Sequence, residues 1–366
     1  MKNKISSALL ALTVFATFCN CEYRNDLVGN WRDRGEVNAR GRGGATSFII
    51  DNKAYLVGGR GYYKTETYFK DTWQFDPETK SWKQFDTVPC EKGRYYSVGF
   101  AIDGKGYYGT GIGKSAVYFK DFYEFDPSVD NGEDKLPGKW TKTDSIPGDP
   151  IYGMVGFSIN GIGYAGAGYT KETGYANTYY SFDPNAEEGK KWQIVEHINP
   201  SKRCNGSVFI IDDRAYIVGG SNNSRLVKDF ERFDPSVEKG DLRWYKISQD
   251  FEEDYNSTRV TKVYRHSAAA FTINGRGYLC CGSTGALGSG GKSDVWEYTP
   301  YIGPDHMGRW DEICSFEGTA RSSCQGFAID GVGYVTCGMI GTGDGSFFDD
   351  VWEFHPNEDY EKRIDR

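Results

Sequence analysis

The sequence has few of the residues that usually assemble a metal site or an acid-base centre. Its four histidines are His197, His266, His306 and His355. None of them has a neighbour at metal-ligand or nucleophile-base spacing. The glycine-rich runs GTGIG and GTGDG follow strand patterns and open no helix, so they do not predict a phosphate-binding loop. We therefore expect no metal and no cofactor, and the sequence identifies no catalytic residue.

Long hydrophobic runs are absent beyond the N-terminus. The apolar stretch Ile5–Phe18 follows two lysines and is too short to span a bilayer, which predicts a signal peptide over residues 1–20. Of the two cysteines at its edge, Cys21 fits a bacterial lipoprotein site better, because Cys19 follows a bulky phenylalanine. We expect export to the cell envelope as an outer-membrane lipoprotein, with residues 21–29 as a short tether. Ordinary secretion is the alternative.

The sequence has fewer basic than acidic residues: it contains 43 Lys and Arg and 51 Asp and Glu, which gives a net charge of −8. Loss of the signal peptide removes two lysines and no acidic residue, so the exported chain is more acidic still. Such a protein is a poor candidate for binding nucleic acid or anionic lipid through its general field. We expect no nucleic-acid partner, membrane contact through the lipid anchor alone, and a monomer.

The cysteines of the body do not predict a disulfide framework. Seven remain beyond the signal edge, an odd number without metal-ligand spacing. They are Cys90, Cys204, Cys280, Cys281, Cys314, Cys324 and Cys337. We interpret them as buried free thiols that pack as small hydrophobic residues.

Six copies of one short pattern organise the rest of the chain. The first is FIIDNKAYLVGG, Phe48–Gly59, and the others begin at Phe100, Phe157, Phe209, Phe271 and Phe327. Each copy predicts a hairpin: an apolar strand, a tight turn at Asp/Asn-Gly or its equivalent, and a second strand with a tyrosine at a fixed position. A repeat of about fifty residues with four strands per unit is typical of a β-propeller.

Two more strands complete each unit. A third strand has the pattern Asp-x-Trp/Tyr-x-Phe-Asp-Pro, and a tryptophan opens the fourth in five units: Trp82, Trp140, Trp192, Trp244 and Trp310. The sixth unit ends without a fourth strand, whereas Asn30–Val37, with Trp31, precedes the first hairpin. We therefore predict an all-β, six-bladed propeller over residues 30–357, with the last blade closed by the N-terminal strand and a charged tail over residues 358–366.

The repeat resembles the kelch repeat over about residues 30–357, in its Gly-Gly after the second strand, the aromatic that follows and the tryptophan of the fourth strand. Kelch propellers include enzymes, adaptors and carbohydrate-binding proteins, so the resemblance implies a fold and no activity. In size, export and blade count the chain is also similar to kelch-type sialic acid mutarotases, which interconvert sugar anomers with acid and base side chains and no cofactor. That similarity implies an alternative function, with Glu66, Glu172, Asp254 and Arg265 as candidate acids and bases.

One rim of the propeller carries the candidate binding site. Because neighbouring strands alternate in direction, the second-to-third and fourth-to-first connections share a rim. These loops interleave Tyr and Phe with Lys, Arg, Asn and Ser, and aromatic faces stack on sugar rings while polar groups orient them. The candidates are Tyr68, Tyr96, Tyr118, Tyr169, Tyr175, Asn205 and Arg265. The long connection Asp250–Arg265 is a candidate lid.

The alternative is that these tyrosine-rich loops only pack on one another. The resemblance to kelch adaptors adds that Tyr96 and Asn205 stand at positions similar to those that face ligand in that group.

Five units carry an arginine six residues before the leading phenylalanine: Arg42, Arg94, Arg203, Arg265 and Arg321. The third unit has Ile151 there. One interpretation is a ring of guanidinium groups that binds an anion. The kelch resemblance implies instead that these arginines bond loop backbone, and we take this structural interpretation.

Together these patterns predict an exported, lipid-anchored propeller that binds a glycan or an envelope protein through one rim and performs no chemistry. A sugar mutarotase is the alternative, and a structural scaffold in an envelope assembly is a third possibility.

Overall fold

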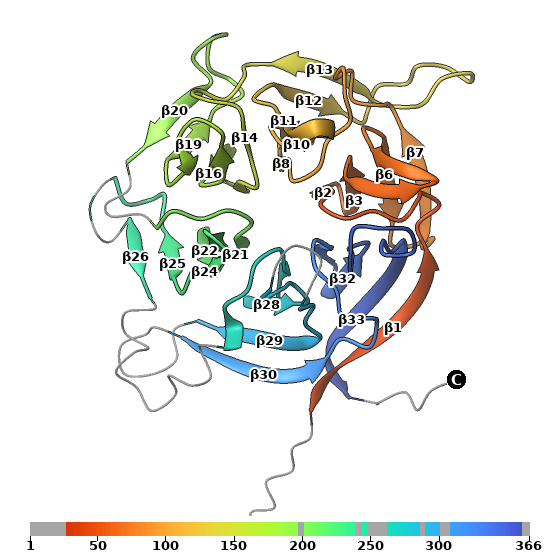
Figure 1. Ribbon diagram of the computed structural model, residues 1–366, viewed down its shortest axis with the longest axis vertical. Helices are drawn as coiled ribbons and strands as arrows, with labels where there is room; N and C mark the ends of the chain where they lie inside the picture. Colours follow the sequence, from red (N-terminus) through yellow and green to blue (C-terminus); the bar gives the residue numbers. More distant parts are fainter. Residues whose placement is uncertain are drawn as a thin grey trace, which may run out of the picture.

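Figure 1 shows the computed structural model of the chain as a closed ring of small sheets around a central axis. The structure describes residues 27–196, 201–238, 240, 243–247, 262–285, 290–300 and 308–360. The predicted signal peptide, Cys21 and residues 250–261 of the candidate lid lie outside these ranges. Among the helices in the described part, none is both long and apolar enough to cross a membrane.

Six four-stranded antiparallel sheets form the blades. The first blade has β2 (Thr46–Ile50), β3 (Lys53–Val57), β6 (Thr72–Asp76) and β7 (Ser81–Phe85), and the second has β8 (Val98–Ile102), β9 (Lys105–Gly109), β12 (Phe122–Asp126) and β13 (Lys139–Thr143). The third has β15 (Val155–Ile159), β16 (Ile162–Gly166), β19 (Tyr179–Phe182) and β20 (Trp192–Val195), and the fourth has β21 (Ser207–Ile211), β22 (Arg214–Val218), β25 (Phe230–Phe233) and β26 (Trp244–Lys246). The fifth has β27 (Ala269–Ile273), β28 (Arg276–Cys280), β29 (Asp294–Thr299) and β30 (Arg309–Ser315), and the sixth has β31 (Gln325–Ile329), β32 (Val332–Thr336), β33 (Asp350–Asp359) and β1 (Val28–Glu36).

The first strand of every blade lies nearest the axis. These six strands contact one another in a closed circle, from β2 through β8, β15, β21 and β27 to β31 and back to β2. The predicted hairpins are present, and Phe48 faces Tyr55 across the first one with ring centroids 5.8 Å apart. Both turn residues of this hairpin, Asp51 and Asn52, have positive φ, as a two-residue turn that follows the strand twist requires.

Neighbouring blades pack through the same phenylalanines. A Cβ at Gly106, on the second strand of the second blade, would lie 2.3 Å from the ring of Phe48 in the first blade. Gly163, Gly277 and Gly333 meet the phenylalanine of the preceding blade in the same way. Glycine at this position therefore lets adjacent blades approach closely, and the ring is held together by buried aromatic contacts.

The N-terminal strand closes the last blade, as predicted. In the ladder between β1 and β33, Trp31 lies opposite Phe354, and in the first blade Trp82 lies opposite Phe75 in the same way. Arg32 and Arg34 add ion pairs across this junction, to Glu358 at 2.8 Å and to Glu353 at 2.6 Å. The paired strands begin at Val28 and end at Asp359, two residues beyond the predicted limits at each end.

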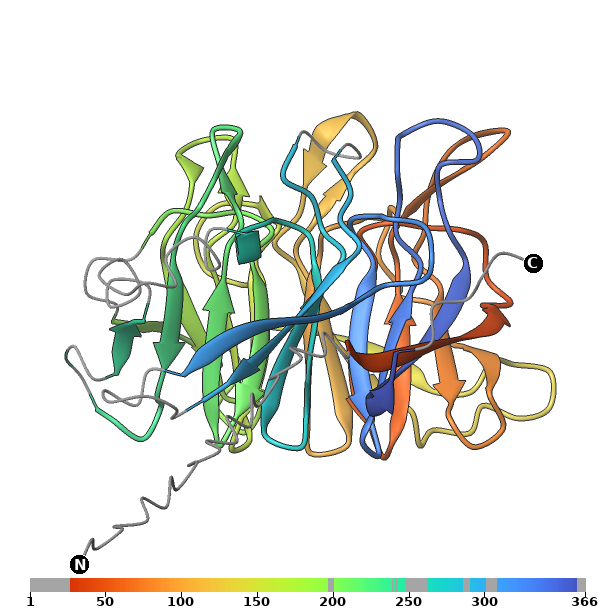
Figure 2. The same ribbon diagram turned by 90° about the horizontal axis from the view of Figure 1, so that it is seen from below.

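Short strands extend the second-to-third connections above the blades, and Figure 2 shows these loops projecting from one side of the ring. They are β4 (Arg60–Tyr63) with β5 (Thr65–Tyr68), β10 (Ile112–Gly113) with β11 (Val117–Tyr118), β17 (Tyr169–Thr170) with β18 (Gly174–Tyr175), and β23 (Ser221–Asn222) with β24 (Arg225–Leu226). β14 (Ile151–Tyr152), from the fourth-to-first connection before the third blade, pairs with β17. We call this side the upper rim. It is the rim on which the sequence places the candidate site.

Candidate functional site

A closed circle of backbone hydrogen bonds surrounds the axis at the base of the upper rim. Each N–H donates to the carbonyl of the equivalent residue in the preceding blade, with N···O distances of 2.7 to 2.9 Å. The six residues are Gly44, Tyr96, Gly153, Asn205, Ser267 and Ser323, and all have φ between 52° and 68°. We call them the axial ring. Because the left-handed backbone recurs in every blade, the side chains of the ring are held around one axis.

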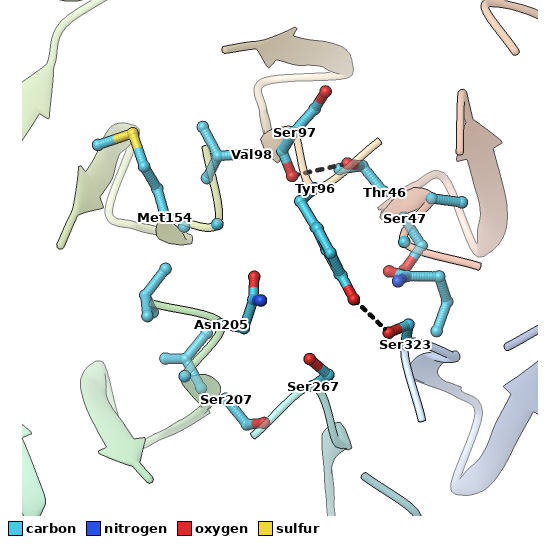
Figure 3. A pocket seen from close by; sticks show the side chains of 18 of the residues that line it. Thr46, Ser47, Tyr96, Ser97, Val98, Met154, Asn205, Ser207, Ser267 and Ser323 are labelled. Atoms are coloured by element: carbon cyan, nitrogen blue, oxygen red, sulfur yellow. Dashed lines mark hydrogen bonds between the residues drawn. The ribbon is translucent and has the colours of Figure 1, made fainter. Parts of the chain in front are cut away.

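A cavity of about 250 Å³ lies on the axis beside and below the axial ring (Figure 3). We call it the central cavity. Its polar side chains come from every blade except the third: Thr46, Ser47, Tyr96, Ser97, Asn205, Ser207, Ser267, Ser323 and Gln325. None of the described residues that line it carries a charged side chain. The cavity is therefore a neutral space rich in hydroxyl groups.

A second cavity, of about 220 Å³, lies above the axial ring, and we call it the upper pocket. The second and third blades give it four tyrosines: Tyr95, Tyr96, Tyr152 and Tyr175. The fourth and fifth blades give it mostly polar groups: Asn205, Ser221, Ser224, Arg225, His266 and Thr284. The pocket thus combines an aromatic side with a polar side. Tyr96 and Asn205 line both the upper pocket and the central cavity.

The five candidate tyrosines are brought together in one continuous cluster, the tyrosine belt. Tyr68 contacts Tyr95, which contacts Tyr96, with ring centroids 5.9 and 4.8 Å apart. The cluster continues through Tyr152, Tyr118 and Tyr169 to Tyr175. The tyrosine-rich loops therefore do pack on one another, and the same packing holds Tyr152 and Tyr175 at the upper pocket. Burial raises the pKa of Tyr68 to about 12, so its hydroxyl stays protonated at neutral pH.

His266 is the functional group that the sequence did not single out. It is buried in the wall of the upper pocket, with Nε2 2.8 Å from the Gly285 carbonyl and Nδ1 3.1 Å from the Ser267 hydroxyl. Because a carbonyl oxygen only accepts, Nε2 donates to Gly285. Ser267 in turn belongs to the axial ring. These two contacts fix the orientation of the imidazole in the pocket wall.

A positional signal would have found the missed pocket residues. Tyr95, Tyr152, Cys204 and His266 each stand one residue before an axial-ring position, in four successive blades, and all line the upper pocket.

The five repeat arginines point their guanidinium groups into the protein. All are at most 1% exposed, and each donates to a backbone carbonyl of its own blade, as Arg42 does to Gly58 at 2.9 Å. Arg42, Arg94, Arg265 and Arg321 also pair with the aspartate that opens the third strand: Asp71, Asp121, Asp294 and Asp350. Arg265 therefore lines neither cavity, although it was also a candidate for ligand binding.

These ion pairs lower the pKa values of three of the aspartates. Burial would raise the pKa of the Asp71 carboxyl, but the hydrogen bonds and charge of Arg42 outweigh it and hold that pKa below its usual value. Asp121 and Asp294 are lowered in the same way by Arg94 and Arg265. In the third blade Ile151 replaces the arginine and Thr178 replaces the aspartate, so both charges are absent together. In the fourth blade Arg203 lies 3.2 Å from Glu231.

Within the part of the chain that the structure describes, neither the cysteines nor the charged side chains form a reactive centre apart from the upper pocket. All seven cysteines are buried and without a disulfide. Burial raises the pKa of Cys204, which lines the upper pocket, to about 12, so its thiol is a poor nucleophile at neutral pH. No group of three His, Cys, Asp or Glu side chains is close enough together to hold a metal ion within the described residues.

Comparison with known proteins agrees with this architecture. The Kelch motif family matches residues 41–87 and 202–247, in the first and fourth blades. A search of curated proteins finds no match. Among solved structures, that of the protein YjhT is similar with a TM-score of 0.64 and 16% sequence identity, over 86% of this chain and 95% of YjhT. At this level of identity the likeness concerns the fold alone.

Proposed function

Because this chain is a kelch-repeat β-propeller, we propose that it binds a glycan, free or carried by an envelope protein, in the upper pocket and performs no chemistry on it. The observation that supports the proposal is the division of this pocket into a tyrosine side and a polar side. A sugar ring has an apolar face of C–H groups and a periphery of hydroxyls. Tyrosine faces suit the first, and amide, hydroxyl and guanidinium groups suit the second.

Each side of the pocket has a distinct role in this proposal. Tyr152 and Tyr175 stack on the sugar, since both are partly exposed and held by the tyrosine belt. Asn205, Arg225 and Thr284 bond its hydroxyls from the opposite blades. Ligand pockets commonly measure about 300 to 1,000 Å³. A pocket of about 220 Å³ is small on that scale, so it takes one sugar residue of a longer chain.

A glycan array probed with the protein and with Tyr152→Ala and Arg225→Ala tests this function. We expect the wild type to bind a defined group of glycans, and each variant to lose at least about tenfold in affinity. Tyr62→Ala is the control, because Tyr62 is exposed on the upper rim and lines neither cavity. Binding that survives both pocket variants, or no binding to any glycan, would contradict the proposal.

Tyr68→Ala and Tyr118→Ala serve as a graded comparison. Tyr118 contacts Tyr152 with ring centroids 5.0 Å apart, whereas Tyr68 contacts Tyr95 at the far end of the belt. Because neither lines the upper pocket, we expect losses smaller than that of Tyr152→Ala, with Tyr118→Ala the larger of the two.

We propose in addition that the chain is exported and anchored by a lipid on Cys21. The support is the charged and apolar pattern of residues 1–20. Metabolic labelling with a palmitate analogue tests it. Label should enter the wild type and Cys19→Ser, and should be absent from Cys21→Ser. Label that persists in Cys21→Ser would rule out this anchor.

The mutarotase alternative has one supporting observation, that His266 and Tyr96 both line the upper pocket. Of its earlier candidates, Arg265 pairs with Asp294, Glu66 pairs with Arg60 at 3.1 Å, and Asp254 lies outside the described residues. Glu172 lines neither cavity. Measurement of sialic acid anomer exchange by NMR separates the two functions: acceleration that His266→Ala abolishes would favour the mutarotase.

A further inference from the structure

The central cavity is bounded by small residues of the innermost strands. At one position of the innermost strands the six blades carry Ser47, Gly99, Gly156, Val208, Ala270 and Gly326, and all six residues line the cavity. Three of them are glycines, at which a Cβ would lie 2.1 to 2.8 Å from the innermost strand of the preceding blade, as Gly156 would from Val98. The hydroxyls that line the cavity donate to protein acceptors, as Thr46 does to the Ser97 carbonyl and Ser207 to the Ala268 carbonyl, so each can still accept a further hydrogen bond.

The chemistry of this wall selects uncharged groups. A charged group placed in the cavity would lose its hydration without meeting a counter-charge, because no charged side chain lines it. Serine and threonine hydroxyls can each donate one hydrogen bond and accept others, and the amides of Asn205 and Gln325 offer both donors and acceptors. A ligand group with several hydroxyls can pair with such a wall, as water does.

Tyr96 separates the central cavity from the upper pocket. It lines both spaces, and Figure 3 shows the side chain with its hydroxyl directed at Ser323. The two hydroxyl oxygens are 2.6 Å apart. On the pocket side the ring contacts Tyr95 at 4.8 Å. Only 8% of Tyr96 is exposed, so its ring is buried at the boundary of the two spaces.

We propose that the central cavity is a second compartment of the ligand site, which receives an uncharged, hydroxyl-bearing group when Tyr96 turns away from Ser323. This inference rests on the proposed function, in which a sugar ring is held in the upper pocket. The exocyclic carbons of such a sugar carry hydroxyls and no charge. They extend from the ring toward the axis, where Asn205 lies at the boundary of both spaces.

Sorbitol, a neutral linear polyol, is the probe, and gluconate is its charged counterpart of the same chain length. Binding to the full chain is measured by titration calorimetry and by NMR. We expect saturable binding of sorbitol and at least about tenfold weaker binding of gluconate. Ser47→Val should weaken sorbitol binding by about tenfold, since it removes a hydroxyl and reduces the space. Valine already occupies the equivalent position as Val208, so the variant should fold.

Two further variants make the result specific. Ser81→Val makes the same chemical change on an exposed outer strand, and should leave sorbitol binding as in the wild type. Tyr96→Phe keeps the ring and removes the bond to Ser323, so it should strengthen sorbitol binding severalfold. Absence of saturable sorbitol binding, equal binding of gluconate, or indifference to both Ser47→Val and Tyr96→Phe would overturn the inference. Loss of glycan binding in Tyr152→Ala concerns the upper pocket alone, so the two proposals can fail separately.

Discussion

The indole of Trp31 packs on the ring of Phe354 with centroids 4.7 Å apart, and this contact joins the first strand of the propeller to its last. Phe316 of the fifth blade meets the same indole at 4.8 Å, so Trp31 also ties the sixth blade to its neighbour. Trp31 is fully buried. A strand that is distant in sequence thus makes the same contact as the local fourth strand of every other blade.

Trp31→Ala should lower the free energy of unfolding by about 3–5 kcal/mol, the usual cost of removing a buried tryptophan. Urea unfolding of the full chain measures it. Ile194→Ala is the control, because Ile194 is 72% exposed and its change should stay within about 0.5 kcal/mol. A cost below about 1 kcal/mol for Trp31→Ala would mean that β1 does not close the ring.

Arg94 and Asp121 form a pair whose members depend on each other. Arg94 is 1% exposed, so Arg94→Ile leaves the aspartate beside an apolar side chain and should cost about 3–5 kcal/mol. The third blade carries Ile151 and Thr178 at the same two positions, which shows that a blade can form without either charge. Arg94→Ile/Asp121→Thr copies that blade.

The double variant should recover most of what Arg94→Ile loses, because no unpaired carboxylate remains. A double-mutant cycle by urea unfolding measures the coupling. Costs that simply add would show that the two residues stabilise the blade independently.

Much of the fold was predictable because its signals are local and repeated. Phe48 and Tyr55 mark a hairpin by themselves, and five further copies fix the period. The closure by Trp31 was predictable by counting: five tryptophans followed six hairpins, and one strand at the N-terminus had no partner. The hairpin pattern and the tryptophan strand each occur once per blade, so a blade that lacks one of them can be recognised in the sequence.

The site was only partly predictable because it depends on where side chains from different blades point. The loop composition identified Tyr175, and the resemblance to kelch adaptors identified Tyr96 and Asn205; all three line the upper pocket. Neither identified Tyr95 or His266, because their only signal in the sequence is a repeat position, one residue before the axial ring, at which the residue type differs from blade to blade. The repeat position of Arg265 in the sequence was equally compatible with a side chain that binds a ligand and with one that points into the protein interior. The Asp294 carboxylate, which comes much later in the chain, decides between them.

The axial ring predicts opposite effects of two substitutions at Asn205. Its φ of 55° is easy for glycine and asparagine and strained for a β-branched residue. Asn205→Gly should change the free energy of unfolding by less than about 1 kcal/mol, as Gly44 and Gly153 already occupy the ring. Asn205→Val should cost about 1–3 kcal/mol. Equal stability of the two variants in urea unfolding would contradict the account of the ring.

Acid should destabilise the propeller through its ion-paired carboxylates. The pKa values of Asp71, Asp121 and Asp294 are held below the usual value, as is that of Glu353 beside Arg34. An unfolded aspartate has a pKa of about 3.9, so below that pH the unfolded chain binds more protons than the folded one. The stability that these groups contribute is therefore complete above about pH 5 and is lost as the pH falls through their lowered values.

Urea unfolding from pH 7 to pH 3 measures this loss. Asp349, whose pKa is raised by burial and by Glu36, acts in the opposite sense, but it is one group against seven described carboxyl groups whose pKa is lowered. We expect a flat region down to about pH 5 and a steep decline below pH 4. Arg94→Ile/Asp121→Thr lacks one of the paired carboxylates, so its decline should be shallower than that of the wild type. Stability that rises toward pH 3, or identical slopes in the two proteins, would show that the pairs do not set the acid limit of the fold.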